Sequence, residues 1–439
     1  MKTAVIGVGH VGLVSAACLA EWGHEVIGMD DDEERIAGLQ KGQLPFYEPG
    51  LEPLVVRHHQ SGRLRFVHDL AEAIDKADVV FVCVGTPPLP GGGPNLSYVE
   101  AVGRKVATLA TGDLVLVEKS TVPVSTGQRL SQVIQREQGN DGGPAIEVVS
   151  NPEFLREGSA VQDTLHPDRI VIGVSSTRAA EILKELYAPV VEVDGTPLVV
   201  TDVPTAELIK HASNAFLAMK ISYINAVARI CDLTGADVET VAHGMGLDER
   251  IGPHFLKPGL GYGGSCFPKD VDAFAHLARQ IGYQFGLLEE VRRINEDQRT
   301  IVLSKLRDEL WHLQGKTVTL LGAAFKPGTD DLREAPALHL ARLLLAEGAT
   351  VRIYDPVALA GVERELPDVI TFDDALKACE GAHAAVVCTE WSEVAELDPA
   401  ALEAALAYPI LVDGRNALDP DECRRAGLHY HGVGRGAFV

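Results

Sequence analysis

Short apolar runs alternate with helix-like stretches at both ends of the chain. Residues 2–30 (KTAVIGVGHVGLVSAACLAEWGHEVIGMD) follow the order strand, tight turn, helix, strand. Residues 77–88 (ADVVFVCVGTPP) add a buried strand that ends in a Gly-Thr-Pro loop. Strands that alternate with helices in this way are typical of a parallel sheet with helices on its faces. The pattern predicts an α/β fold for the N-terminal part of the chain.

The same order recurs in the C-terminal part. Residues 315–322 (GKTVTLLG) resemble the first strand of the chain, and residues 349–356 (ATVRIYDP) place Asp355 where Asp30 stands in the first copy. Residues 382–390 (AHAAVVCTE) correspond to the buried strand with the Gly-Thr-Pro loop. The chain therefore holds two copies of one structural pattern.

A long helical pattern separates the two copies. It has Thr201 or Asp202 as the candidate N-cap, Pro204 in the first turn and Gly235 as the stop signal. A helix of roughly 30 residues, against a mean of about 11–12, normally spans two domains or forms an oligomer seam. We therefore expect an α/β fold of two Rossmann-like, doubly wound domains joined by a long central helix. The expected divisions are residues 1–200, 201–310 and 311–439.

Composition narrows the possible partners. The 439 residues are 46% hydrophobic and 23% charged, as in ordinary globular domains, and the formal net charge is -23. Nucleic acid is not expected as a partner, because neutralising phosphates requires clustered Lys and Arg. No apolar stretch reaches the roughly 18 residues of a membrane helix, so no membrane association is expected. A few local basic residues leave room for a small anionic ligand.

Cysteine usage indicates a reducing compartment. The seven cysteines form no CxxC pair and no metal-like spacing, and their number is odd, so we expect a cytoplasmic protein without a metal site. The first 20 residues also resemble a signal peptide, but their glycine spacing favours a tight turn between a strand and a helix. The cysteines are Cys18, Cys83, Cys231, Cys266, Cys379, Cys388 and Cys423.

The N-terminal turn carries a dinucleotide signature. Gly7, Gly9 and Gly12 form G-x-G-x-x-G between a strand and a helix, where the glycines make the turn, admit a pyrophosphate and let helix and strand pack closely. Asp30 stands at the position of the acid that binds the ribose hydroxyls of NAD, which favours NAD over NADP. Arg35, which lies nearby, weakens that preference. The loop at Gly85 and Thr86 is a further candidate for ligand binding.

The second copy lacks this signature. Its turn, residues 322–327 (GAAFKP), has no glycine triplet, so a second dinucleotide is not expected there. Its loops are candidates for another nucleotide.

Residues 261–270 (GYGGSCFPKD) place Cys266 after glycines that would let the backbone approach a ligand. Nearby positive charge, here from Lys269, raises the thiolate fraction of a thiol. A thiolate beside a nicotinamide can capture an aldehyde as a thiohemiacetal, which loses a second hydride to give a thioester and then a carboxylate. Most cysteines are instead buried for packing, and that is our interpretation of the other six.

Such chemistry also needs an oxyanion stabiliser and a carboxylate. Lys210 and Asn214 are four residues apart on one face of the long helix, and Glu153 and Glu157 lie in SNPEFLREG. Taken alone, Lys210 and Asn214 are more typical of a solvated helix surface. Glu153 and Glu157, taken alone, are equally typical of ordinary surface acids.

Several longer motifs resemble a known family. AVIGVGHVGLVSAACLA, YEPGLEPL, VGTPP, EKSTVPVSTG, SNPEFLREGSA, HPDRIVIG, AELIKHASNAFLAMKISYINA, RIGPHFLKPGLGYGGSCFPKD and FKPGTDDLRE occur in the order and spacing of the UDP-glucose/GDP-mannose dehydrogenase family, and within it of UDP-glucose 6-dehydrogenases. The resemblance extends from Met1 to about Arg415. It implies oxidation of C6 of UDP-glucose to a carboxylate with two NAD+ and no metal, in a cytoplasmic homodimer or larger homo-oligomer built on the long helix.

The resemblance also implies roles for individual residues. Cys266 would be the nucleophile, with Lys210 and Asn214 stabilising the oxyanion. Asp270 and Thr121 would position water or accept protons, and Glu153 would assist thioester hydrolysis. Implied cofactor contacts are Gly7, Gly9, Val11, Gly12, Asp30, Arg35, Gly85, Thr86, Thr121, Glu157, Lys269 and Arg333. Implied substrate contacts are Glu153, Phe154, Leu155, Lys210, Asn214, Arg250, Lys257, Tyr262, Gly263, Phe325, Lys326 and Arg415, with Arg250 reaching a neighbouring subunit.

Two positions depart from the family pattern, and three alternatives stay open. Ser125 stands where Gly is common and His166 where Asn is usual. The close alternative is the same chemistry on GDP-mannose or a UDP-N-acetylhexosamine. A two-electron 3-hydroxy-acid dehydrogenase would not need Cys266, and a non-catalytic NAD-dependent regulator would bind the dinucleotide without turnover.

Overall fold

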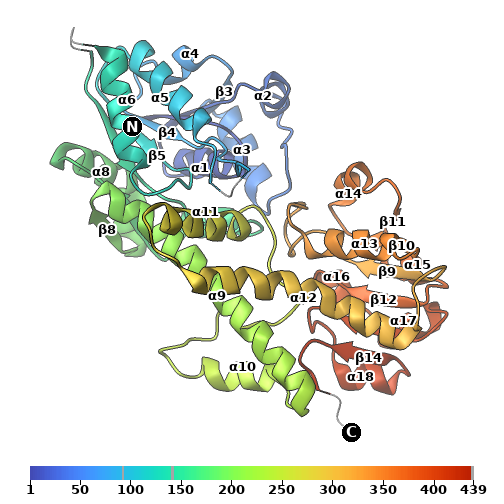
Figure 1. Cartoon of the computed structure of the whole chain (residues 1–439). Helices are drawn as coiled ribbons and strands as arrows, with labels where there is room; N and C mark the ends of the chain where they lie inside the picture. Colours follow the sequence, from blue (N-terminus) through green and yellow to red (C-terminus); the bar gives the residue numbers. More distant parts are fainter. Residues whose placement is uncertain (91–92, 140–142, 437–439) are drawn as a thin grey trace. The chain divides into compact units, whose positions relative to one another are not determined.

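The computed structural model describes residues 1–90, 93–139 and 143–436. The chain divides into two compact units, each described here by itself (Figure 1). The first unit comprises Met1–Ser213 and Asp272–Gly282, and the second comprises Asn214–Val271 and Tyr283–Val439.

One sheet forms the centre of the first unit. Within the described residues its eight strands have the order β3-β2-β1-β4-β5-β6-β7-β8, and all neighbours are parallel except β6 and β7. The chain order reverses beside β1, and ligands of such sheets bind at the carboxyl ends of the strands at this point. The strands are β1 (Lys2–Ile6), β2 (Glu25–Met29), β3 (Leu64–Val67), β4 (Val79–Val82), β5 (Leu114–Glu118), β6 (Ile146–Ser150), β7 (Ile170–Gly173) and β8 (Leu198–Thr201).

Helices cover both faces of this sheet. They are α1 (His10–Glu21), α2 (Glu33–Gln40), α3 (Leu51–Gln60), α4 (Leu70–Ile74), α5 (Ser97–Leu109), α6 (Thr126–Gln138), α7 (Ala160–Leu165) and α8 (Thr177–Asp194). Successive strand residues point to opposite faces, so Val5 and Phe81 pack with α1 and α8, whereas Ile6 and Val82 pack with α5 and α6. The result is a three-layer α/β/α core.

The second unit contains a smaller sheet that is also doubly wound. Its six described strands are all parallel and have the order β11-β10-β9-β12-β13-β14. The strands are β9 (Thr317–Leu321), β10 (Thr350–Tyr354), β11 (Ile370–Phe372), β12 (Ala384–Val387), β13 (Ile410–Asp413) and β14 (His429–Gly432). The helices around it are α13 (Pro336–Ala346), α14 (Leu359–Glu365), α15 (Ala375–Cys379), α16 (Ser392–Ala395), α17 (Pro399–Ala405) and α18 (Pro420–Arg425).

A long helix joins the two sheet-containing parts of the chain. It is α9 (Val203–Thr234), drawn as one unbroken helix in Figure 1. The side chain of Asp202 accepts a hydrogen bond from the Thr205 N–H at its start, and Gly235 has a φ of +78° at its end. The predicted fold, with two doubly wound sheets and a long central helix, is confirmed. The helices that follow are α10 (Val238–Gly246), α11 (Phe267–Gln280) and α12 (Gly286–Leu310).

The boundary between the two compact units falls inside α9. The three-part division predicted from the sequence stays a prediction. Among the described residues, no helix combines the length and the apolar character needed to cross a bilayer.

Candidate functional site

The glycine turn after β1 has an open side and a packed side. Gly7 has a φ of +90°, which favours glycine. A Cβ at Gly12 would overlap the carbonyl oxygen of Gly7, so only glycine lets α1 approach the turn this closely. Apart from its neighbours in the chain, no described residue has an atom within 4 Å of the Cβ position at Gly9. Since α1 begins directly after Gly9, its unpaired N–H groups make this turn suitable for a pyrophosphate.

Asp30 is held in place at the end of β2. Its buried carboxylate accepts hydrogen bonds from the N–H groups of Val8 at 2.9 Å and Asp32 at 3.1 Å. Arg35 forms an ion pair with the same carboxylate at 2.9 Å. The guanidinium of Arg35 is therefore already engaged by Asp30, which lessens the argument for a 2′-phosphate. Ribose binding by Asp30 stays a prediction.

Asp355 occupies the matching position in the second sheet but has a different setting. Its carboxylate accepts hydrogen bonds from the N–H groups of Ala323, Ala324, Val357 and Ala358 and from the indole of Trp391, at 2.8–3.1 Å. These donors occupy the oxygens that a ribose would use. That the second copy does not bind a dinucleotide stays a prediction.

The loops after β4 and β5 meet at the carboxyl edge of the first sheet. The hydroxyl of Thr86 donates to the carbonyl of Thr121 at 3.0 Å, and the hydroxyl of Ser120 donates to the carbonyl of Val84 at 2.7 Å. The Cβ position of Gly85 is open within 4 Å. The predicted cofactor residues of these loops therefore share one edge of the sheet with the glycine turn.

Glu153 and Lys210 form a buried ion pair in the first unit. Lys210 Nζ lies 2.8 Å from Glu153 Oε1, and the other carboxylate oxygen accepts the N–H of Leu155 at 2.9 Å. The ammonium also lies 5.4 Å from the ring centre of Phe154. The two residues are 6% and 3% exposed, which excludes the alternative of a solvated helix surface for Lys210.

A pocket in the first unit borders this ion pair. It encloses about 580 Å³ of space, part of it open to solvent, and Glu153, Phe154 and Leu155 contribute to its wall. The guanidinium of Arg169, in the same wall, stacks over the Phe154 ring at 3.9 Å. Burial lowers the pKa of Arg169. The NPEF segment is thus packed between a cation and an ion pair, which restricts its movement.

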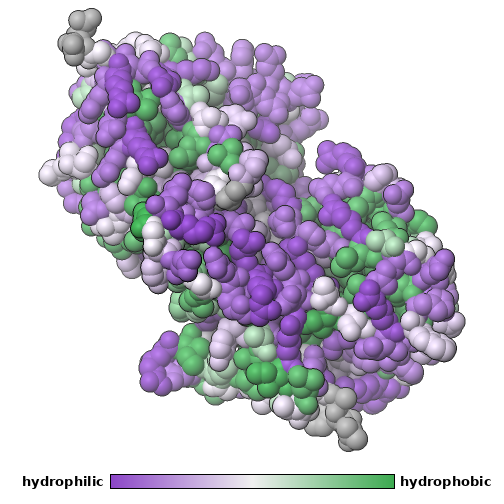
Figure 2. All heavy atoms as spheres, viewed as in Figure 1, coloured by the Kyte–Doolittle hydropathy of each residue, from purple (hydrophilic) through white to green (hydrophobic). Residues whose placement is uncertain are grey.

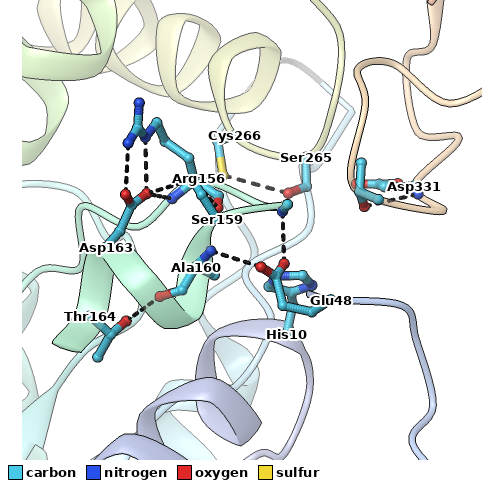
Figure 3. A network of polar contacts seen from close by, with 12 residues as sticks. His10, Glu48, Arg156, Ser159, Ala160, Asp163, Thr164, Ser265, Cys266 and Asp331 are labelled. Atoms are coloured by element: carbon cyan, nitrogen blue, oxygen red, sulfur yellow. Dashed lines mark hydrogen bonds and ion pairs between the residues drawn. The ribbon is translucent and has the colours of Figure 1, made fainter. Parts of the chain in front are cut away.

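Glu48 holds the segment that follows Glu157, a role that sequence reasoning missed. Its buried carboxylate accepts the N–H groups of Gly158 at 2.7 Å and Ala160 at 2.8 Å, and it pairs with His10 at 3.0 Å (Figure 3). His10 lies inside the glycine turn, so one carboxylate links two predicted cofactor segments. The motif YEPGLEPL was the available signal, but its glutamate is 110 residues from Gly158. Glu157 itself is buried.

Cys266 lies in the second unit, immediately before α11. Its carbonyl accepts the N–H of Asp270 at 2.9 Å, so it caps the helix, and its half-buried thiol lies 3.5 Å from the hydroxyl of Ser265 (Figure 3). The positive end of the helix dipole stabilises negative charge at this position.

Asp270 gathers two other predicted residues in the same unit. Asn214 Nδ2 donates to Asp270 Oδ2 at 2.6 Å, and Lys269 Nζ lies 2.8 Å from Asp270 Oδ1. Asp270 is 1% exposed and Asn214 is 6% exposed. The side chain of Asn214 is therefore not at a solvated helix surface.

The other six cysteines are packing residues, as predicted. Burial raises the pKa of five thiols to about 12, and it also raises the pKa of Cys231, so little thiolate forms at any of them near neutral pH. The five are Cys18, Cys83, Cys379, Cys388 and Cys423.

The glycines before Cys266 make room for the protein's own chain. A Cβ at Gly261 would lie 2.6 Å from the side-chain oxygen of Asn295, and one at Gly263 would overlap the carbonyl of Glu334. Gly264 has a φ of +80° and packs on the Phe325 ring. We expected these glycines to admit a ligand. The structure shows a packing role, which is to dock this loop on neighbouring segments, and ligand contact by Gly263 stays a prediction.

The remaining predicted residues of the second unit have diverse surroundings. Arg415 donates to the carbonyls of Cys388, Gly261 and Phe325 at 2.8–3.3 Å. Tyr262 is buried, with its backbone bound to Asn295, whereas Lys326 lies 5.4 Å over Phe325. Arg333 pairs with Asp331, Arg250 pairs with Asp248 on the surface, and Lys257 is exposed. Roles for these side chains in binding stay predictions.

Metal chemistry finds no support in side-chain clustering. Within residues 1–90, 93–139 and 143–436, no three His, Cys, Asp or Glu side chains are grouped so as to hold an ion.

Comparison with known proteins covers nearly the whole chain. Residues 1–191 match the NAD binding domain of the UDP-glucose/GDP-mannose dehydrogenase family, residues 204–297 match its central domain, and residues 319–420 match its UDP binding domain.

Individual relatives agree with this match. A UDP-glucose 6-dehydrogenase of Bacillus subtilis is 44% identical over 99% of this chain and 94% of its own. A UDP-glucose dehydrogenase structure from Pyrobaculum islandicum has a TM-score of 0.91 at 38% identity, covering 99% and 97% of the two chains. A UDP-D-ManNAc dehydrogenase structure from Pyrococcus horikoshii has a TM-score of 0.87 at 28% identity, covering 99% of both. With its glycine turn, its two sheets and its cysteine at a helix N-terminus, the chain belongs to the UDP-glucose/GDP-mannose dehydrogenase family.

Proposed function

We propose that this protein oxidises UDP-glucose to UDP-glucuronate with two NAD+ per turnover. The observation that carries the proposal is 44% identity to a UDP-glucose 6-dehydrogenase over 99% of the chain. Cys266 at a helix N-terminus and the buried Lys210–Glu153 pair supply the chemical groups that a four-electron oxidation needs. The balanced reaction converts one primary alcohol, two NAD+ and one water into one carboxylate, two NADH and three protons.

The first unit has a site that fits NAD. The open face of Gly9 and the N-terminus of α1 suit the pyrophosphate, and Asp30 suits the ribose. NAD+ held there by these residues would supply the hydride acceptor for both oxidations. Thr121 lies in a loop of the same sheet edge, where its hydroxyl can position water or take part in proton transfer.

Cys266 divides the second oxidation into smaller steps. Its thiolate adds to the C6 aldehyde, forming a C–S bond, and the resulting thiohemiacetal loses a hydride to become a thioester. Water then attacks the thioester carbon, the C–S bond breaks, and the carboxylate leaves as the thiolate is released. Asp270 can accept the proton of the attacking water, held in place by Asn214 at 2.6 Å.

Lys210 and Asn214 would stabilise the oxygen that becomes negative in these steps. Both are donors on buried positions of α9, one helical turn apart. Glu153 orients the Lys210 ammonium through their 2.8 Å contact and would assist the hydrolysis of the thioester.

We favour UDP-glucose over related nucleotide sugars as the substrate, because the relatives named for UDP-glucose are more similar in sequence to this chain. The relatives named for UDP-glucose are 44% and 38% identical to this chain, whereas one named for an N-acetylated mannosamine is 28% identical. GDP-mannose and UDP-N-acetylhexosamines are therefore the alternatives to test.

A second copy of this chain is the proposed partner of α9. Phe216, Tyr223 and Ile230 are each more than half exposed and recur every seven residues, so they share one face of the helix. Leu233 is 88% exposed near the end of the same helix. Figure 2 shows apolar residues gathered over α10 and the C-terminal part of α9. An apolar stripe of this kind suits a symmetric dimer.

The stoichiometry of NADH formation tests the proposal. Excess NAD+ is mixed with a limiting, known amount of UDP-glucose, and the absorbance of NADH is read at completion. Two NADH for each UDP-glucose supports the proposal. One NADH means that the reaction stops at the aldehyde and contradicts the proposed mechanism. If no NADH forms, UDP-glucose is rejected, and GDP-mannose and the N-acetylated UDP-sugars are tested in the same way.

A further inference from the structure

Glu118, the last residue of β5, has a buried carboxyl group that lacks the usual hydrogen-bond donors among the described residues. Its exposed fraction is 1%, and neither of its oxygens has a hydrogen-bond donor among the described residues. Ionised carboxylates in a protein interior need donors or cations to offset the loss of water. Burial and the charge of Glu207 raise the pKa of Glu118 well above its ordinary range. A neutral Glu118 would avoid this cost and could itself donate a hydrogen bond.

Glu207 on α9 is the acceptor that Glu118 faces. Its two oxygens accept the N–H of Ser125 at 2.6 Å and the N–H of Gly127 at 2.8 Å, both at the start of α6. A Cβ at Gly127 would lie 3.4 Å from one oxygen of Glu207 and 3.6 Å from one of Glu118, so the two carboxyl groups meet beside this glycine. Glu207 is 2% exposed, so both carboxyl groups are shielded from solvent.

The segment between β5 and α6 is held at both ends by these contacts. It carries Thr121, whose carbonyl accepts the hydroxyl of Thr86. His211 of α9 donates from Nε2 to the carbonyl of Val122 at 2.7 Å. Glu207 and His211 are one turn apart on α9, and Lys210 lies between them in sequence. The first turns of α9 thus hold both the Thr121 segment and, through Lys210, Glu153.

We infer that Glu118 and Glu207 form an acid–carboxylate clamp that positions the Thr121 segment against α9 for the proposed oxidation. Neither residue touches substrate or cofactor in this assignment, so both are positioning residues. The proton of Glu118 bridges the end of β5 to Glu207, and Glu207 in turn fixes the start of α6. The clamp itself does not depend on the proposed function, whereas its expected effect on turnover rests on that function.

The other charged groups near the clamp are already engaged. On α9, Lys210 pairs with Glu153 and His211 binds Val122. From α6, the contacts to Glu207 are backbone N–H groups. When a rise in pH ionises Glu118, it therefore places a second negative charge beside Glu207, and we expect the clamp to open.

Infrared difference spectroscopy tests the clamp without any substrate. The spectrum of Glu118→Gln is subtracted from that of the wild type at pH 7, with Glu181→Gln, an exposed glutamate on α8, as the matched control. We expect the wild type to show the carbonyl stretch of a protonated carboxylic acid, and Glu118→Gln to lose it. Persistence of this band in Glu118→Gln, or its absence from the wild type, would overturn the inference.

Kinetics test the positioning role. Glu118→Leu, which cannot donate, should lower kcat by about tenfold or more while KM changes by less than about twofold, and Glu118→Gln should recover most of the loss. At alkaline pH, Glu118→Gln should keep activity that the wild type loses. Identical alkaline profiles for wild type and Glu118→Gln would contradict the inference, even if Glu118→Leu does not fold. If the wild type forms no NADH, the proposed function fails and the infrared result alone decides the clamp.

Discussion

Single residues show how family departures are accommodated. Ser125 stands where glycine is common, and its φ of +77° lies in the left-handed region that favours glycine. Its N–H donates to a carboxyl oxygen of Glu207 at 2.6 Å, which helps to hold the residue in this conformation. His166, the other departure, pairs with Asp194 at the surface at 2.9 Å. Neither change disturbs a predicted reacting group.

Restoring glycine at Ser125 should stabilise the protein. The left-handed conformation costs a non-glycine residue about 1–2 kcal/mol, and glycine removes this cost. Part of the gain is lost because glycine also raises the conformational entropy of the unfolded chain. We expect Ser125→Gly to raise the free energy of unfolding by about 0.5–1 kcal/mol, measured by urea titration. The control is Ser213→Gly, inside helix α9, which should lower it. A loss of stability in Ser125→Gly would refute the strain argument.

The thiol of Cys266 should be indispensable for turnover. A serine hydroxyl is a far weaker nucleophile near neutral pH, so Cys266→Ser should lower steady NADH formation by about a thousandfold or more. Cys231→Ala, which removes a buried thiol elsewhere, is the control and should stay active. Full turnover of Cys266→Ser would instead favour a two-electron dehydrogenase. Circular dichroism checks that both variants are folded.

Among the secondary-structure elements, helix α9 contributes residues to both units. Its first turns hold Glu207, Lys210 and His211 in the first unit, whereas Asn214 begins its contribution to the second unit. These residues contact segments that lie far away in the sequence. Its buried positions serve the candidate site, and its exposed apolar positions serve the proposed dimer.

The exposed face of α9 predicts a change of oligomeric state on substitution. Tyr223→Asp combined with Ile230→Asp places charge on an apolar stripe, so sedimentation should show monomer in place of dimer. Folding should survive because both side chains are more than half exposed. The control is Leu287→Asp, a half-exposed leucine on α12, which should not change the mass. A variant that stays dimeric would place the interface elsewhere.

The end of β5 predicts a pH dependence of stability. In the unfolded chain Glu118 ionises near its ordinary pKa of 4.5, whereas in the folded protein its pKa is raised by burial and by Glu207. The unfolded state thus binds fewer protons above pH 4.5, so the wild type loses stability as pH rises toward the folded pKa. The difference in unfolding temperature should therefore shift in favour of Glu118→Gln as the pH rises above about 4.5. A constant difference would mean that Glu118 titrates normally.

At the scale of the whole molecule, two similar sheets have been adapted differently. The glycine turn of the first sheet is open at Gly9, whereas the corresponding acid of the second sheet, Asp355, is occupied by the protein's own donors. The two sheets therefore differ in the surroundings of the position predicted to bind a ribose. The family match to an NAD binding domain and a UDP binding domain agrees with this division.

Cofactor choice should be visible in the stability of the whole protein. NAD+ at 100 times its Kd stabilises the folded state by about 2.7 kcal/mol, which raises the unfolding temperature. NADP+ should give a smaller shift at equal concentration, because the buried carboxylate of Asp30 repels a 2′-phosphate. Asp30→Asn should narrow the gap between the two cofactors. Equal shifts with NAD+ and NADP+ in the wild type would contradict the assigned preference.

The sequence by itself determined the features that depend on neighbours along the chain. The strand pattern, the glycine turn and the caps of α9 all follow from residues a few positions apart, so periodicity and turn chemistry were sufficient to predict them. Cys266 was found in the same way, through its motif, and the other six thiols were correctly assigned to packing. The family prediction is confirmed, whereas the catalytic roles stay predictions.

Only the tertiary structure decided which distant groups meet. Glu207 is 80 residues from Gly127, and Glu48 is 112 residues from Ala160, so no local pattern connects them. The same holds for the glycines before Cys266, whose space is taken by segments far along the chain. Strand order and helix packing bring such groups together, and a buried carboxyl group acquires its protonation state from the neighbours that this packing supplies.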